Sequence, residues 1–226
     1  MWLHKWTIHD LETSYKISDE MLQNEKKRVR IAVIDNEQVD NMVSNLRAAG
    51  YGDVSALKNI SGLEEVEKYD LILIDVKGIG LKFLRGTKSA SLEGLAMARE
   101  IKRQYPLKKV VVFSAGLQEY EDNYILHNIV DGSFVKDGDI SERNKKIDLC
   151  IRQRVDPVYL WKKNRLLLID QGVSIYDVAK LESKIVRSIL KKRALPEIDI
   201  ERVVGNAVAI TGLIKSISEL VALTLH

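Results

Sequence analysis

The chain has 226 residues, of which 46% are hydrophobic and 30% are charged, and its formal net charge is +3. This composition allows a buried core in a soluble protein of one large domain, or of one domain with an appendage. The single cysteine, Cys150, excludes a disulfide framework and a cysteine zinc site within one chain, and the four histidines form no ligand pair that would favour a histidine metal site.

Neither end of the chain shows a signal for export or membrane insertion. The first 30 residues contain no uninterrupted apolar run of the kind that signal peptides have. The most apolar tract, residues 203–225, is interrupted by Lys215 and Glu219, which makes it a poor membrane span. We therefore expect a soluble cytoplasmic protein.

Residues 1–28 are polar and predict an N-terminal arm or helix, and a regular alternation follows them. The predicted strands cover residues 29–35, 53–57, 71–75, 108–115 and 132–136. The predicted helices cover residues 38–50, 61–69, 91–106, 117–130 and 140–155. Strands that are apolar throughout and alternate with helices are typical of a parallel sheet covered on both faces. The pattern predicts an α/β fold, with a doubly wound five-stranded parallel sheet, over residues 29–154.

Residues 155–226 have a different pattern, which predicts a C-terminal all-helical region. Its predicted helices cover residues 157–172, 174–193 and 203–225. The last of these is long and nearly uncharged, so it either packs under the other tail helices or forms a dimer interface. We expect this region to serve as an output or dimerisation region, with a homodimer formed through the C-terminal helices.

Charge is unevenly distributed between the two parts. Residues 151–226 hold 13 Lys and Arg against 8 Asp and Glu, whereas residues 1–150 hold 22 against 24. Such an asymmetry indicates two functional parts. A basic stripe lies along one predicted tail helix, at Lys180, Lys184, Arg187 and Lys191. It allows a nucleic-acid face, but we favour a solvated face in which positive charge stabilises a helix C-terminus.

Polar residues end four of the five predicted strands. They are Asp35 with Asn36, Asp75, Ser114 and Lys136. In open parallel sheets, ligands bind outside the carboxyl ends of the strands. A strand-end carboxylate can attack a phosphoryl group and become an acyl phosphate. Mg²⁺ binds carboxylate and carbonyl oxygens, and an ammonium or a hydroxyl can bind phosphoryl oxygens. The strand ends therefore predict a phosphoryl-transfer site.

Four motifs carry a resemblance to a known family. "IAVIDNE", "LILIDV", "VVVFSA" and "GSFVKD" follow one another on the expected strands. In this order they resemble the CheY-like receiver domain of bacterial response regulators. The resemblance covers about residues 29 to 153. It implies two-component signalling, with a histidine kinase or another phosphodonor protein as the partner and Mg²⁺ as the cofactor.

The resemblance also implies roles for individual residues. Asp75 would be the phosphoacceptor, Ser114 the switch hydroxyl and Lys136 the phosphate-binding lysine. The implied metal ligands are Asp35, Asn36, Asp75 and the carbonyl of Lys77. Beyond aspartyl autophosphorylation and dephosphorylation, no enzyme activity is expected.

The sequence departs from the family at several positions. The family usually has a second acid where this chain has Asn36, and the missing charge should weaken Mg²⁺ binding. Glu37 either compensates or points away. Asp137 replaces the usual proline after the strand-five lysine, and Ser133 replaces a switch aromatic. Phe134 should face the other side of the strand. A long connection over residues 76–90 also follows Asp75, where the family has a shorter one.

Three hypotheses follow from the sequence. The leading one is a phosphoacceptor receiver switch that controls the helical output or dimerisation region. The second is a pseudo-receiver, an interaction module without phosphotransfer, which the departures at Asn36, Ser133 and Asp137 favour. The third is a phosphatase of the haloacid-dehalogenase type, which we rank last because its D-x-D pair is represented only by Asp35 and Glu37. Taken alone, Asp75 could also be a surface acid that ends a strand.

Overall fold

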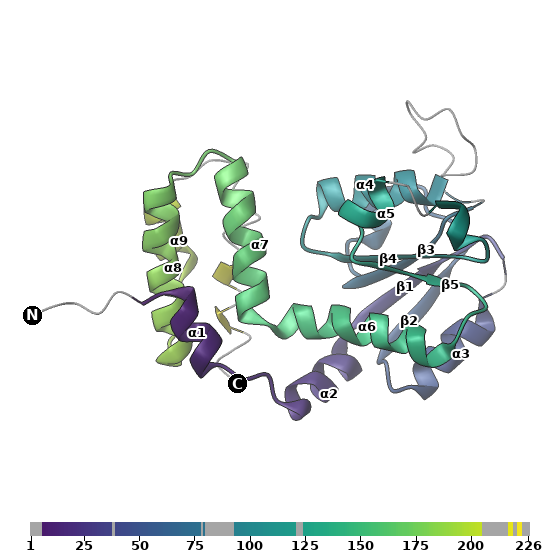
Figure 1. Ribbon diagram of the computed structural model, residues 1–226, viewed down its shortest axis with the longest axis horizontal. Helices are drawn as coiled ribbons and strands as arrows, with labels where there is room; N and C mark the ends of the chain where they lie inside the picture. Colours follow the sequence, from purple (N-terminus) through teal and green to yellow (C-terminus); the bar gives the residue numbers. More distant parts are fainter. Residues whose placement is uncertain are drawn as a thin grey trace, which may run out of the picture. The chain divides into compact units, whose positions relative to one another are not determined.

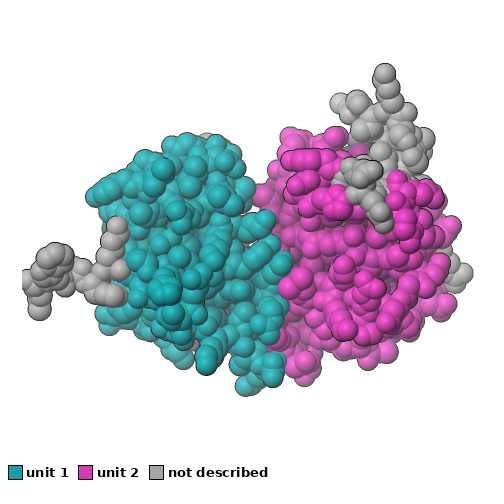
Figure 2. Space-filling model, viewed as in Figure 1, with its two compact units in different colours: residues 1–21, 152–226 teal, residues 22–151 magenta. Residues whose placement is uncertain are grey.

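The computed structural model describes residues 6–37, 39–77, 79, 93–120, 124–204, 217–218 and 221–222. The chain divides into two compact units (Figure 2): residues 22–151 form a sheet unit, and residues 1–21 with 152–226 form a helical unit. Most of two predicted segments, the connection over residues 76–90 and the tract over residues 203–225, lies outside the described residues.

The sheet unit is built on five parallel strands (Figure 1). Their order in the sheet is β2-β1-β3-β4-β5. The strands are β1 (Arg30–Ile34), β2 (Asp53–Leu57), β3 (Leu71–Asp75), β4 (Lys109–Ser114) and β5 (Gly132–Val135). This is the doubly wound order of flavodoxin-like and CheY-like sheets. The predicted fold class is therefore confirmed.

Helices cover both faces of this sheet. One face carries α3 (Asp40–Ala48) and α6 (Ile140–Val155). The other carries the 3₁₀ helix η1 (Leu63–Val66), α4 (Glu93–Gln104) and α5 (Tyr124–Asn128). Two-sided burial explains why the strands are apolar at nearly every position, since each face of a strand meets its own layer of helices.

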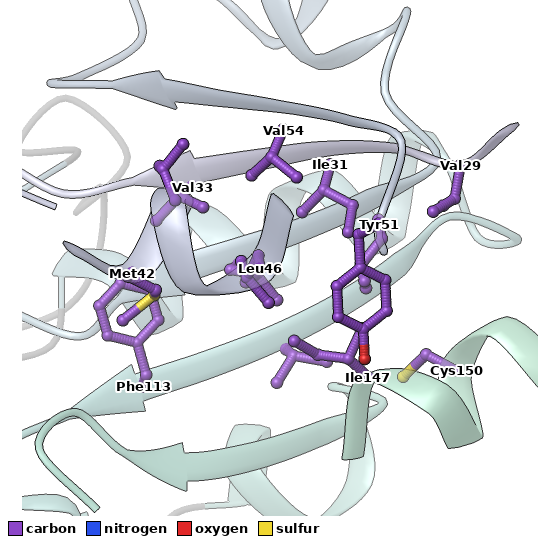
Figure 3. Close-up of a cluster of buried hydrophobic side chains, with 14 of the residues drawn as sticks. Val29, Ile31, Val33, Met42, Leu46, Tyr51, Val54, Phe113, Ile147 and Cys150 are labelled. Carbon is purple, nitrogen blue, oxygen red and sulfur yellow. The ribbon is translucent and has the colours of Figure 1, made fainter. Parts of the chain in front are cut away.

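Neighbouring residues of β4 show how the two apolar layers form. Val111 and Phe113 belong to the cluster on the α3 and α6 face, part of which Figure 3 shows. Val110 and Val112 belong to the cluster on the α4 and α5 face. Successive side chains of a strand point to opposite faces, so one apolar run supplies both layers.

Some local predictions differ from the structure. Gly50 follows α3 with a φ of 89°, as a glycine after a helix end should. The helix predicted over residues 61–69 is only the four-residue turn η1, and Glu65 rather than Glu64 accepts the backbone N–H groups of Ser61 and Gly62. The helix predicted over residues 117–130 is represented by the 3₁₀ helix η3 (Leu117–Tyr120) and by α5.

The N-terminal segment contributes to both units. The segment α1 (Ile8–Ser14) packs in the helical unit, whereas the end of α2 (Asp19–Arg28) belongs to the sheet unit. There Lys26 Nζ lies 3.2 Å from Asp148 Oδ1, which also accepts a 2.8 Å hydrogen bond from the Tyr51 hydroxyl. These contacts hold the end of α2 against α6.

The helical unit is formed by α1, α7 (Pro157–Asp170), α8 (Ile175–Leu190) and α9 (Glu197–Val204). Leu11 of α1 is fully buried in the same core as Trp161 of α7. Glu182 of α8 joins these helices, since its carboxylate accepts hydrogen bonds from the backbone N–H of Ile8 at 3.2 Å and from Trp161 Nε1 at 2.8 Å. Residues 8–14, within the segment predicted as an N-terminal arm over residues 1–28, thus contribute to this core.

Long apolar helices of the kind that cross membranes are absent from the part of the chain that the structure describes.

Candidate functional site

Parallel register brings the predicted site residues to one edge of the sheet. Ile34 of β1 pairs with Ile74 of β3, Asp75 with Phe113 of β4, and Ser114 with Val135 of β5. Asp35, Asp75, Ser114 and Lys136 therefore stand at the carboxyl edge, where four neighbouring strands end. Asp35, Asp75 and Ser114 are each less than a tenth exposed. Buried polar side chains at such an edge are typical of a ligand site rather than of a solvated surface.

Lys136 is the centre of this site. Its Nζ lies 2.6 Å from Glu37 Oε2, 2.8 Å from Asp35 Oδ2 and 3.5 Å from Asp75 Oδ2. Its backbone N–H donates a 3.0 Å hydrogen bond to the carbonyl of Ser114. An ammonium has three N–H donors and can serve all three carboxylates. The structure thus brings together Asp35, Asp75 and Lys136 as the sequence predicts, and it adds Glu37.

Three carboxylates around one ammonium shift the ionisation of the site. Burial and, after it, the negative charge of Asp35 raise the pKa of Asp75 above its usual value. Burial by itself would lower the pKa of Lys136, but its hydrogen bonds with Asp35 and Glu37 raise that pKa well above the ordinary value. The hydrogen bond from Lys136 lowers the pKa of Glu37. At neutral pH, Lys136 is therefore a permanent cation.

Backbone groups fix the two acids further. The N–H of Glu37 donates a 2.8 Å hydrogen bond to Asp35 Oδ1, and the N–H of Lys77 donates a long one, 3.5 Å, to Asp75 Oδ1. The Ser114 hydroxyl accepts a long hydrogen bond, 3.4 Å, from the N–H of Gly116. Each of these three side chains thus accepts a hydrogen bond from a backbone donor two residues further along the chain.

The donor set fits a magnesium ion with few protein ligands. Asp35 and Asp75 bring two buried carboxylates to one place, where burial and, after it, the negative charge of Asp35 raise the pKa of Asp75 although Lys136 acts to lower it. Mg²⁺ commonly uses one or two carboxylates and keeps several waters. Asn36 is exposed and brings no charge. Within the described residues, no group of three or more His, Cys, Asp or Glu side chains could hold a metal ion.

The aromatic residue of β5 lies where the sequence predicts. Phe134 stacks on Phe113 with ring centroids 5.5 Å apart and an interplanar angle of 10°. Both belong to the cluster on the α3 and α6 face. Ser133 pairs with Val112, whose side chain points to the opposite face. The position at which the family usually has a switch aromatic is therefore held by a hydroxyl on the α4 and α5 face.

Besides Glu37, two contacts next to the site were not predicted. Gly94, near the start of α4, approaches the backbone of Asp75 so closely that a Cβ atom would lie 1.8 Å from the Asp75 carbonyl oxygen. Lys77 Nζ forms a 2.9 Å ion pair with Glu119 Oε2. A glycine inside the apolar run of a predicted helix was the available signal for the first feature. The ion pair had none, because it joins residues 42 positions apart.

The basic stripe of α8 is partly occupied by contacts within the helical unit. Lys184 Nζ donates a long hydrogen bond, 3.5 Å, to the carbonyl of Asp199, and the Lys191 ammonium lies 6.0 Å from the ring centroid of Trp6. Lys180 and Arg187 are exposed. Nucleic-acid binding by this stripe stays a prediction.

Some solved structures are similar to about half of the chain. No protein-family model and no curated protein matches the chain. Among solved structures, a response regulator receiver domain protein from Clostridium thermocellum is 23% identical, with 56% of this chain and 96% of that chain covered and a TM-score of 0.44.

Two further solved structures give similar values. The receiver domain of NtrX from Brucella abortus is 22% identical, with 54% of this chain and 98% of that chain covered and a TM-score of 0.42. A CheY-like response regulator receiver domain protein from Methanospirillum hungatei JF-1 is 18% identical, with 55% and 94% covered and a TM-score of 0.44. The strand order given above is the observation that supports the fold of the sheet unit.

Proposed function

We propose that the protein is a phosphoacceptor switch of the two-component type, in which Asp75 accepts a phosphoryl group. One observation carries the proposal. Three strand ends bring Asp35, Asp75 and Lys136 together, so that both carboxylates lie within 3.5 Å of Lys136 Nζ. A single buried acid could simply end a strand. A buried acid beside a second acid and a permanent cation provides a nucleophile, a metal ligand and a phosphate-binding group, which phosphoryl transfer uses.

The chemistry of the step is simple. An oxygen of the Asp75 carboxylate forms a bond to phosphorus, and the bond from phosphorus to the donor's leaving atom breaks with its electron pair. The leaving group takes its proton from solvent or from the donor protein. Lys136 pairs with a phosphoryl oxygen, and the Ser114 hydroxyl donates a hydrogen bond to another. The product is an acyl phosphate on Asp75.

Magnesium is part of this proposal. Asp35 and Asp75 would hold the ion, with the carbonyl of Lys77 and the amide oxygen of Asn36 as further ligands. Bound Mg²⁺ would neutralise charge on the phosphoryl oxygens. Because Asn36 supplies no charge, binding should be weaker than at a site with two adjacent acids.

The partner and the response complete the proposal. A histidine kinase or another phosphodonor protein supplies the phosphoryl group, and this transfer takes place in the cytoplasm. A phosphoryl group on Asp75 shifts the population of two conformations around Ser114. The helical region over residues 155–226 responds by changing its partner binding or its homodimerisation.

A pseudo-receiver without phosphotransfer is the second candidate. The distances at Lys136 favour it, since the ammonium lies nearer to Glu37 and Asp35 than to Asp75. The exposed Asn36 in place of an acid also favours it.

One experiment decides between the two candidates. The full chain is incubated with Mg²⁺ and acetyl phosphate, and its intact mass is measured. We expect the increment of one phosphoryl group, lost in Asp75→Asn and kept in Asp70→Asn, a matched change at the amino end of β3 where Asp70 pairs with Arg30. No increment, together with unaltered folding, supports the pseudo-receiver. An increment that survives Asp75→Asn contradicts the assignment of the acceptor.

A further inference from the structure

Glu37 has an unusual position for an exposed acid. Its side chain is 71% exposed, yet its Oε2 makes the shortest of the three carboxylate contacts with Lys136 Nζ, at 2.6 Å. Asp35 follows at 2.8 Å, and Asp75 is the most distant at 3.5 Å. The ammonium is therefore held toward the end of β1 and away from the acid that would carry a phosphoryl group.

We propose that Glu37 is a positioning residue that retains the Lys136 ammonium at β1 and competes for it with an anionic group on Asp75. This inference rests on the proposed function, because the competing anion is the phosphoryl group. A phosphoryl group on Asp75 adds negative charge beside that residue and attracts the ammonium across the site. Lys136 then gives up its contact with Glu37, and the phosphoryl oxygen takes the N–H donor that becomes available.

The backbones on both sides of the contact are fixed, so this exchange needs only side-chain movement. The N–H of Glu37 is held by Asp35 Oδ1 at 2.8 Å, and the N–H of Lys136 is held by the carbonyl of Ser114 at 3.0 Å. Lysine has a flexible four-carbon stem. Reorientation of that stem moves the ammonium between β1 and β3 while the sheet stays in place.

The strength of the retention follows from the exposure of Glu37. Ion pairs with one solvent-exposed partner are weak and are screened by salt. The Glu37 contact thus shifts the position of Lys136 without preventing its release. Asp35 differs, because its side chain is fully buried, and we expect it to stay paired with Lys136 after phosphorylation of Asp75. Of the two contacts on the β1 side, the Glu37 contact is the one that breaks.

The first test compares two variants that remove one charge from the same edge of the sheet. Glu37→Gln removes the charge that holds Lys136. Glu119→Gln removes a comparably exposed charge that pairs with Lys77 instead. In the full chain with Mg²⁺ and acetyl phosphate, we expect Glu37→Gln to be labelled on Asp75 about two- to fivefold faster than the wild type at low salt, in keeping with the small strength of exposed pairs. Glu119→Gln should match the wild type.

Salt provides the second comparison. Added salt screens the exposed Glu37 contact, so the ratio of the two labelling rates should fall toward one as ionic strength rises. A ratio that stays at one throughout, or a slower rate in Glu37→Gln, overturns the inference and leaves the proposed function standing.

A spectroscopic readout separates the two proposals. The ¹⁵N–¹H signal of the Lys136 ammonium reports its hydrogen-bond partners in the absence of any phosphodonor. We expect it to shift in Glu37→Gln and to stay in place in Glu119→Gln. If no variant is labelled, the proposed function fails, and this signal alone decides the inference: a shift specific to Glu37→Gln supports the retention of Lys136 by Glu37, and an unchanged signal overturns it.

Discussion

The two edges of the sheet hold buried acids in opposite electrostatic surroundings. At the amino edge, Asp131 lies 2.8 Å from Lys102 Nζ and 3.1 Å from Lys109 Nζ, and it also accepts a hydrogen bond from the N–H of Val110. At the carboxyl edge, three carboxylates share the Lys136 ammonium. At the amino edge, two lysines surround Asp131, whereas at the carboxyl edge three acids surround Lys136.

The pKa values follow this contrast. Burial favours the neutral form of Asp131, but Lys102 and Lys109 outweigh it and hold the pKa of Asp131 below its usual value. Burial and Asp35 raise the pKa of Asp75. A buried acid paired with two cations stabilises the fold, whereas acids in excess of their cation are poised to take up another cation or to react. The comparison favours the carboxyl edge as the proposed functional end of the sheet and the amino edge as a structural one.

The largest expected effect is on stability, and it distinguishes the two acids directly. Asp131→Asn removes the carboxylate that Lys102 and the buried Lys109 share, and the loss of one partner from a buried pair typically costs about 3–5 kcal/mol. Asp75→Asn removes one of two mutually repelling acids and should leave the free energy of unfolding unchanged or higher. Chemical denaturation of both variants measures the difference. Equal losses in the two would remove the distinction between the edges.

The next effect concerns the contact between α4 and Asp75. Gly94→Ala places a Cβ atom 1.8 Å from the Asp75 carbonyl oxygen, so the backbone must move, at a cost of about 1–3 kcal/mol. The movement should also lower labelling of Asp75. Gly132→Ala is the matched control, because its Cβ would meet only Val111 side-chain atoms at 3.8 Å and 3.9 Å. A Gly94→Ala variant as stable and as well labelled as Gly132→Ala would show that the close approach is unimportant.

The smallest effect is in the pH dependence of stability. The folded-state pKa of Asp131 is lowered, so its stabilisation is present above the unfolded value of about 3.9 and is lost as the pH falls through the folded value. The folded-state pKa of Asp75 is raised, so its ionisation opposes folding, and acidification removes that penalty. Unfolding measured from about pH 3 to pH 6 should therefore depend less on pH in Asp131→Asn and more in Asp75→Asn. Changes of the opposite sign would contradict the assigned surroundings.

The sheet and its polar edge could be predicted from sequence because both depend on short-range patterns. Five apolar runs alternating with helices define a parallel sheet, and the residues that end the runs must meet at one edge. This reasoning is sufficient to predict that Asp35, Asp75 and Lys136 lie together. The same logic predicts that Phe134 and Ser133 lie on opposite faces, because strand residues alternate.

The features that escaped prediction depend on long-range contacts and side-chain rotamers. Leu11 belongs to the same core as Trp161, which lies 150 positions further along the chain. Local periodicity in the sequence cannot predict which distant residues share a core. From sequence, the Glu37 side chain could point to solvent or to the site. Its contact with Lys136 depends on the conformations of both side chains, which the sequence pattern does not give. The same applies to Asp131, whose two lysines come from different segments.

The central claim, that Asp75 accepts a phosphoryl group, is tested most directly by locating the modification. The full chain is treated with Mg²⁺ and either acetyl phosphate or a phosphorylated histidine kinase, reduced with borohydride to trap acyl phosphates, digested, and mapped by mass spectrometry. The account predicts that the trapped position is Asp75 and that neither Asp35 nor Glu37 is modified. Modification at another residue, or none with both donors while the chain remains folded, would contradict it.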